Sequence, residues 1–147
     1  MMAGLKKFED ILAWQKARKA SKRIYEITAG GNFAKDYGLR DQIRRAAVSV
    51  AANIAEGSKR PGSADDARFL DIARGSLAES QCLLLLCRDL GFCPVNFADK
   101  LVSDAEDISR MLNALRKAVL RRAKAVGGDK GGDNADRRPK ARRGDEP

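Results

Sequence analysis

The sequence predicts an all-α protein, an antiparallel up-down four-helix bundle. Along four long segments, apolar residues recur at alternating steps of three and four, the period of an amphipathic helix. No segment shows the two-residue alternation of strands, and the short links between the segments favour antiparallel neighbours. The 147 residues suffice for one core. The predicted helices cover about residues 9–28, 39–56, 64–90 and 96–123, within a bundle domain of residues 1–126.

The first two predicted helices each carry one apolar stripe and end at glycine. Gly30 and Gly31 are expected to end the first helix, and Gly57 ends the second. The first stripe comprises Ala13, Ala17, Ala20, Ile24 and Ile27. The second comprises Leu39, Ile43, Ala46, Ala47, Val50 and Ile54.

The last two predicted helices are joined by a very short loop. Ser63 followed by Asp65 and Asp66 is typical of a helix N-terminus, and Gly91 before Phe92 indicates a Schellman-type end. The seam of the third helix is predicted at Phe69, Ala73, Ser76, Ser80, Leu83, Cys87 and Leu90. The fourth stripe comprises Phe97, Leu101, Ala105, Ile108, Leu112, Leu115 and Val119.

Composition argues against most enzyme classes. The chain has no histidine, which removes the commonest general base near neutral pH and the commonest transition-metal ligand. The three cysteines, Cys82, Cys87 and Cys93, form no CxxC pair and are expected to be reduced and buried. We therefore expect no catalytic residues, no cofactor and no metal. An acid/base pair could be formed by Glu56 and Glu79, but a structural role for both carboxylates is the stronger interpretation.

The N-terminus and the apolar runs of the sequence indicate where in the cell the protein is expected. The longest apolar run, from Cys82 to Cys87, is far shorter than the roughly 20 residues of a membrane-spanning helix. Nothing at the N-terminus resembles a signal peptide. The expected location is the cytoplasm, without membrane association. Residues 127–147 contain Gly, Pro and charge but almost nothing to bury, which predicts a disordered tail.

Basic residues suggest an anionic partner, because the formal net charge is +9. A merely solvated face is the competing interpretation, since the aromatic platforms of base-specific readers are missing. The candidate nucleic-acid contacts are Lys16, Arg18, Lys19, Lys22 and Arg23 on the first helix, Arg40, Arg44 and Arg45 on the second, and Lys59 and Arg60 in the following turn.

Polar residues beside the apolar stripes predict a cross-link between helices. Asn53 lies beside the core stripe, and Ser76 with Glu79 lies on or beside the seam of the third helix. An amide carries both donors and acceptors, so it is suited to bridge two helices. The predicted structural polar network comprises Asn53, Glu56, Ser76 and Glu79.

A second stripe on the first helix contains Ile11, Trp14, Arg18 and Tyr25. Tryptophan, tyrosine and arginine are typical interface anchors, so Ile11, Trp14 and Tyr25 are candidate oligomer contacts. Extra cover for the intramolecular core is an equally good interpretation.

Three stretches carry a family resemblance: FEDILAWQ, QIRRAAVSVAANIAEGSKR and ARGSLAESQ. Over roughly residues 5–120 the chain resembles the four-helix bundle proteins encoded by intervening sequences of bacterial large-subunit ribosomal RNA genes. That resemblance implies a closed homo-oligomer, a pentameric barrel, with a basic surface and no known enzymatic activity. The family also resembles the accessory variability determinant proteins of diversity-generating retroelements, bundles that bind nucleic acid and a reverse transcriptase.

The expected function is therefore that of a non-enzymatic, homo-oligomeric bundle. Its basic surface is expected to bind RNA or DNA non-specifically, as an accessory to a reverse transcriptase or another RNA-associated protein. The alternative is a pure protein-interaction scaffold in which the positive charge only maintains solubility.

Overall fold

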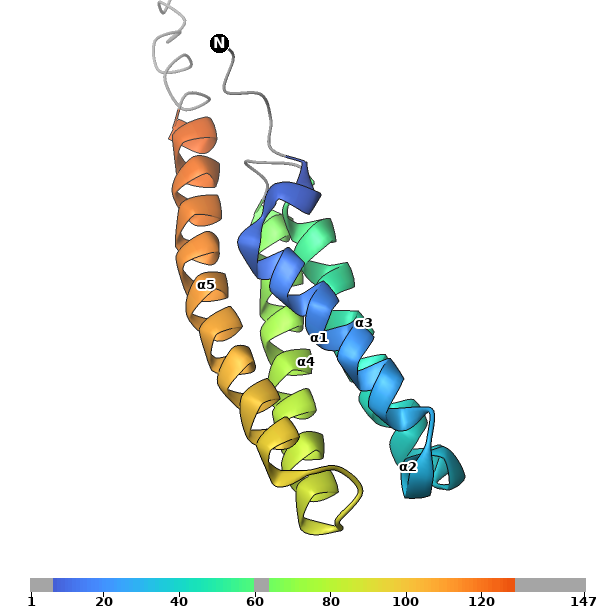
Figure 1. Cartoon of the computed structure of the whole chain (residues 1–147). Helices are drawn as coiled ribbons and strands as arrows, with labels where there is room; N and C mark the ends of the chain where they lie inside the picture. Colours follow the sequence, from blue (N-terminus) through green and yellow to red (C-terminus); the bar gives the residue numbers. More distant parts are fainter. Residues whose placement is uncertain (1–6, 60–63, 129–147) are drawn as a thin grey trace, which may run out of the picture.

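The computed structural model describes residues 7–59 and 64–128, and these residues form helices and no strand (Figure 1). The predicted all-α class is confirmed. A short 3₁₀ turn, η1, precedes the α-helices. None of the described helices is long and apolar enough to cross a membrane. The elements are η1 (Phe8–Asp10), α1 (Leu12–Thr28), α2 (Gly31–Lys35), α3 (Tyr37–Gly57), α4 (Ala64–Asp89) and α5 (Val95–Gly128).

The four long helices bury their apolar stripes against one another in two core clusters. Toward one end, Ala17, Ile54, Leu70 and Leu112 pack together from all four helices. Toward the other end, Ile24 of α1 packs with Ile43, Leu84 and Leu101, among others. The stripes predicted for α1, α3 and α5 supply these buried or half-buried positions, as expected from a 3.6-residue period.

The predicted seam of α4 is partly wrong. Leu70, Leu77 and Leu84 are among the most buried residues of this helix, and none of them was in the predicted seam. Leu90, which was, is 52% exposed. Adjacent apolar pairs cause the error, because Leu70 follows Phe69 and Leu84 follows Leu83, so spacing alone does not decide which member faces the core.

The connection between α1 and α3 contains the short helix α2, which the sequence did not predict. The predicted glycine stop holds only in part, because α1 already ends at Thr28 and Gly31, with a positive φ of 63°, begins α2. Phe33 of α2 is 1% exposed and packs edge-to-face on Phe92, with ring centroids 5.4 Å apart. This helix therefore closes one end of the core.

The ends of α3, α4 and α5 show which capping predictions hold. The carboxylate of Asp36 accepts a hydrogen bond from the backbone amide of Leu39, so α3 begins at Tyr37, before the predicted residue 39. Gly91 has a φ of 72°, and the amide of Phe92 donates to the carbonyl of Cys87, which confirms the Schellman-type end of α4. Helix α5 reaches Gly128, so the start of the predicted tail is helical, and residues 129–147 lie outside the described residues.

The cysteines are free but not equally buried. Cys87 and Cys93 are buried, whereas Cys82 is exposed, so the prediction of three buried thiols is wrong for Cys82. Burial and the nearby Cys93 raise the pKa of Cys87 to about 12, and burial also raises the pKa of Cys93. These two thiols stay protonated at neutral pH and behave as small apolar residues.

Close approach of α3 and α4 depends on Gly57. A Cβ at this position would lie 2.8 Å from the carbonyl oxygen of Asp66, closer than real Cβ atoms approach, and 3.0 Å from Cγ of Leu70, which is also a tight contact. Gly57 is the last residue of α3 and is buried. It therefore serves close packing of two helices in addition to the predicted role of ending one.

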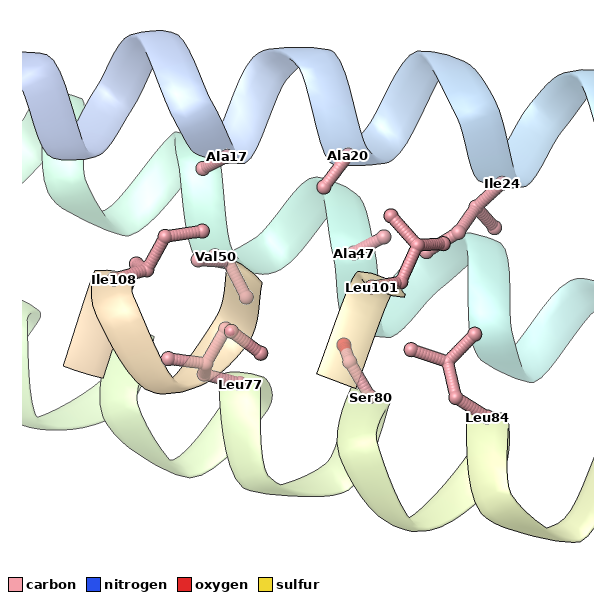
Figure 2. Close-up of a pocket in the computed structure, with 11 residues that line it drawn as sticks. Ala17, Ala20, Ile24, Ala47, Val50, Leu77, Ser80, Leu84, Leu101 and Ile108 are labelled. Carbon is pink, nitrogen blue, oxygen red and sulfur yellow. The ribbon is translucent and has the colours of Figure 1, made fainter. Parts of the chain in front are cut away.

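A small cavity of about 30 Å³ lies in the bundle interior, where short side chains of the four long helices face one another. Figure 2 shows Ala17 and Ala20 of α1 and Ala47 of α3 around it, with Ser80 on the opposite side. The Ser80 hydroxyl donates to the backbone carbonyl of Ser76, so the one polar group facing the cavity is already paired. The cavity is otherwise apolar and too small for a ligand.

Candidate nucleic-acid interface

A groove of about 460 Å³ separates α1 from α5 and carries most of its charge on α1. The buried alanine stripe of α1 faces the core, so lysines and arginine on the adjoining helical rows lie along the groove wall. Lys100 and Asp104 of α5 form the opposite wall. The full lining comprises Leu12, Gln15, Lys16, Lys19, Ala20, Lys22, Arg23, Glu26, Lys100 and Asp104.

Cations outnumber carboxylates in this groove, and three of the cations have no carboxylate partner. The Nζ atoms of Lys22 and Lys100 lie 3.9 Å from Glu26 and 2.9 Å from Asp104, respectively, so both carboxylates have partners. Lys16, Lys19 and Arg23 form no ion pair with any described residue. Exposed pairs of this kind contribute little and rearrange readily, so all five cations are available to a polyanion.

Three of the predicted contact arginines instead lie over aromatic rings of the protein itself. The guanidinium of Arg44 lies 4.6 Å from the ring centroid of Tyr25, and its Nε donates to the Thr28 hydroxyl at 2.8 Å. Arg40 stacks similarly on Tyr37 at 4.7 Å, and Arg18 lies 5.6 Å from the centroid of Trp14. Arg44 thus joins α3 to α1, a structural role that each helix taken by itself does not reveal.

The remaining predicted cations do not join the groove. Arg45 lines a different hollow, between α3 and α4, and Lys59 is exposed just after α3. Arg60 lies outside the described residues. Sequence reasoning missed Lys100, which becomes part of the cluster only because α5 packs beside α1. No three His, Cys, Asp or Glu side chains in residues 7–59 and 64–128 gather closely enough to hold a metal ion.

Comparison with known proteins decides the family. The sequence pattern of the 23S rRNA-intervening sequence protein family matches residues 9–114. The chain belongs to this family. A comparison with curated proteins gives no match.

One solved structure places this member of the 23S rRNA-intervening sequence protein family among known folds. It is the crystal structure of a protein of unknown function, from the S23 ribosomal protein family, of Bacteroides thetaiotaomicron. The two chains are 23% identical, with a TM-score of 0.66, and the similarity covers 72% of this chain and 99% of the other. At this identity the likeness supports the fold alone.

In this family member, Ser49 is the centre of the polar network that joins α3 to α4. The amide of Asn53 donates to the Ser49 carbonyl and hydroxyl, at 2.8 and 3.1 Å, and the Ser49 hydroxyl lies 2.7 Å from that of Ser76. The predicted link between Asn53 and the third helix is thus indirect, and Ser49 was missed. Glu79 is exposed and accepts from Gln42 at 3.4 Å, while Glu56 is also exposed.

The second stripe of α1 divides between core and surface. Ile11 and Trp14 are half-buried and pack against the core, and Trp14 also meets Phe8 edge-to-face at 5.1 Å. Tyr25 is 45% exposed. Tyr25 is thus the most exposed of the three candidate interface residues in this family member.

Proposed function

We propose that this chain forms a closed homo-oligomer, a pentameric ring of antiparallel up-down bundles, that binds RNA or DNA through the α1–α5 groove. The observation that carries the proposal is the uncompensated cluster of Lys16, Lys19 and Arg23, extended by Lys22 and by Lys100. Phosphate oxygens would supply the negative charge that balances these cations. The family resemblance supports the ring.

Binding through this groove is expected to be sequence-tolerant. No aromatic side chain lines it, so the stacking that recognises unpaired bases is missing, and the cations address phosphates only. A ring would repeat the groove around the assembly, and weak contacts would then add wherever one strand spans several copies. The natural role we infer is that of an accessory to an RNA-associated protein such as a reverse transcriptase.

Charge reversal at Lys19 and Arg23 tests this proposal. Both side chains are exposed and unpaired, so Lys19→Glu/Arg23→Glu is expected to preserve the fold while weakening binding to every sequence about tenfold or more at low salt. On a single strand, the slope of log affinity against log salt should fall by about 0.7 for each phosphate that the variant no longer neutralises. Fluorescence anisotropy with labelled RNA and DNA at several salt concentrations measures both quantities.

A matched variant separates the groove from net charge. Lys35→Glu/Arg110→Glu removes the same charge at two exposed positions outside the groove and is expected to bind almost normally. Equal losses of affinity in the two variants would assign binding to overall charge and not to the groove. A wild-type protein that binds neither RNA nor DNA at low salt would instead support the protein-interaction scaffold.

A further inference from the structure

Helix α4 is apolar on two sides, although the bundle covers only one. Its outer side exposes Ile72 (41%), Leu85 (37%) and Leu86 (45%), and Cys82 is exposed among them. An apolar side of a helix is normally packed against another element. We call the outer stripe of Ile72, Gly75, Glu79, Cys82 and Leu86 the α4 face. Its steps of three and four are those of a helix-packing seam.

Gly75 at the middle of this face is not needed by the chain's own fold. A Cβ there would meet nothing within 4 Å, and the φ of Gly75 is not positive. Glycine inside a helix destabilises the helix relative to alanine. Glycine at this position would therefore serve packing only if the backbone of another chain approaches α4 from outside the described bundle.

The α4 face continues into a hollow on its α3 side. This hollow, about 520 Å³ in volume, has a floor of small residues, Ala46, Ser49 and Ser76. Its walls carry Gln42, Arg45 and Glu79. Small residues flanked by larger exposed apolar ones admit the ridge of a docking helix.

A second exposed surface lies on the other side of α3, along its seam with α1. There Tyr25 and Val48 are 45% and 44% exposed, and Val48 follows Arg44 by one helical turn. Arg18 and Arg44 lie over Trp14 and Tyr25, and neither pairs with a carboxylate of the described residues. We call this surface the α1–α3 face. Exposed aromatic residues beside arginine are typical anchors of protein interfaces.

We propose that the α4 face of one copy receives the α1–α3 face of a second copy. Unpaired charges of opposite sign face each other in this arrangement: Glu79 on the α4 face has no cationic partner among the described residues, and Arg18 and Arg44 on the α1–α3 face have no anionic one. Arg45, which also lines the hollow beside Glu79, leaves Glu79 as the group that an arginine of the second copy would meet. Two different faces in contact make a head-to-tail interface, the kind that closes into a ring. This inference rests on the homo-oligomer of the proposed function and assigns its contact surfaces.

Cys82 provides a direct reporter of the buried α4 face. Cys87 and Cys93 are buried within one chain, so a thiol reagent reaches Cys82 alone in an unassembled, folded protein. We expect Cys82 to be protected in the wild-type assembly. Ile72→Glu on the α4 face and Tyr25→Glu on the α1–α3 face should each abolish the assembly and the protection, as measured by light scattering and labelling kinetics. Circular dichroism checks that both variants are folded, and Ala114→Glu, at an exposed position of α5, should change neither property.

Mixing the two variants identifies which faces meet. Each retains the face that the other lacks, so Ile72→Glu with Tyr25→Glu should give a one-to-one heterodimer and nothing larger. If Tyr25→Glu alone forms dimers, α4 faces pair with each other and the proposed occupant is wrong. An assembled wild-type protein that Ile72→Glu leaves intact, with Cys82 reactive, overturns this inference but not the oligomer. A monomeric wild-type protein overturns both, whereas nucleic-acid binding is measured separately.

Discussion

The α3–α4 and α1–α5 pairs are built in opposite ways. Between α3 and α4, Gly57 permits close backbone approach, and hydroxyls of Ser49 and Ser76 meet at 2.7 Å. Between α1 and α5, no hydrogen bond or ion pair joins described residues, and a groove of about 460 Å³ separates their outer sides. Directional contacts thus fix one pair, and apolar burial alone holds the other. The candidate phosphate site lies over the more loosely joined pair.

The largest expected effect comes from breaking the close approach at Gly57. Gly57→Ala places a methyl group 2.8 Å from the Asp66 carbonyl oxygen, which is backbone and yields only if α3 and α4 separate. We expect the free energy of unfolding to fall by about 1–3 kcal/mol, as for other overpacked cores. Urea unfolding measures it.

Gly38→Ala on the same helix is the matched control. A Cβ at Gly38 meets only Asp36, at an ordinary 3.9 Å, so alanine should be neutral or slightly stabilising through helix propensity. A Gly57→Ala protein as stable as Gly38→Ala would show that the α3–α4 contact tolerates separation, and the contrast between the two pairs would then be weaker than the geometry indicates.

Gly57 also illustrates how far sequence reasoning reaches. Periodicity within one helix predicts the main buried side of α1, α3 and α5, because the principal apolar stripe of each helix faces the core. It does not decide the seam of α4, whose second apolar side exposes Ile72 and Leu86. Likewise, a glycine at a helix end looks like a stop signal, while its closeness to Asp66 is a tertiary fact.

The candidate site shows the same limit. Lys16, Lys19, Lys22 and Arg23, which the sequence grouped on one helix, line one groove in the structure. Adding Lys100 to the cluster requires knowing that α5 lies beside α1. Removing Arg44 from it requires knowing that the Arg44 guanidinium lies 4.6 Å from the ring centroid of Tyr25, on another helix. Contacts between helices, which have no periodic signature, account for the differences.

The hydroxyl pair of Ser49 and Ser76 sharpens the comparison at a smaller scale. Ser49→Ala and Ser76→Ala should each lower the free energy of unfolding by about 1 kcal/mol, because each leaves the other half-buried hydroxyl short of a partner. The double variant should cost less than the sum of the two, with a coupling of about 0.5–1 kcal/mol. Simple additivity in urea unfolding would mean that the hydroxyl contact does not hold α3 to α4.

The smallest expected effect comes from tightening the looser pair. Ala20 lines both the interior cavity and the α1–α5 groove, and it is half-buried, so a longer side chain can fill the space without being forced into the core. A cavity of about 30 Å³ corresponds to about 0.7 kcal/mol of missing packing energy, at roughly 24 cal/mol per Å³. Methionine is flexible and a good helix former, so Ala20→Met should raise the free energy of unfolding by up to about 0.7 kcal/mol. Ala114→Met, which adds the same atoms at an exposed position of α5, should change stability little. If Ala20→Met is stabilised no more than this control, the cavity does not limit stability, and the weakness of the α1–α5 pair lies in its missing polar contacts.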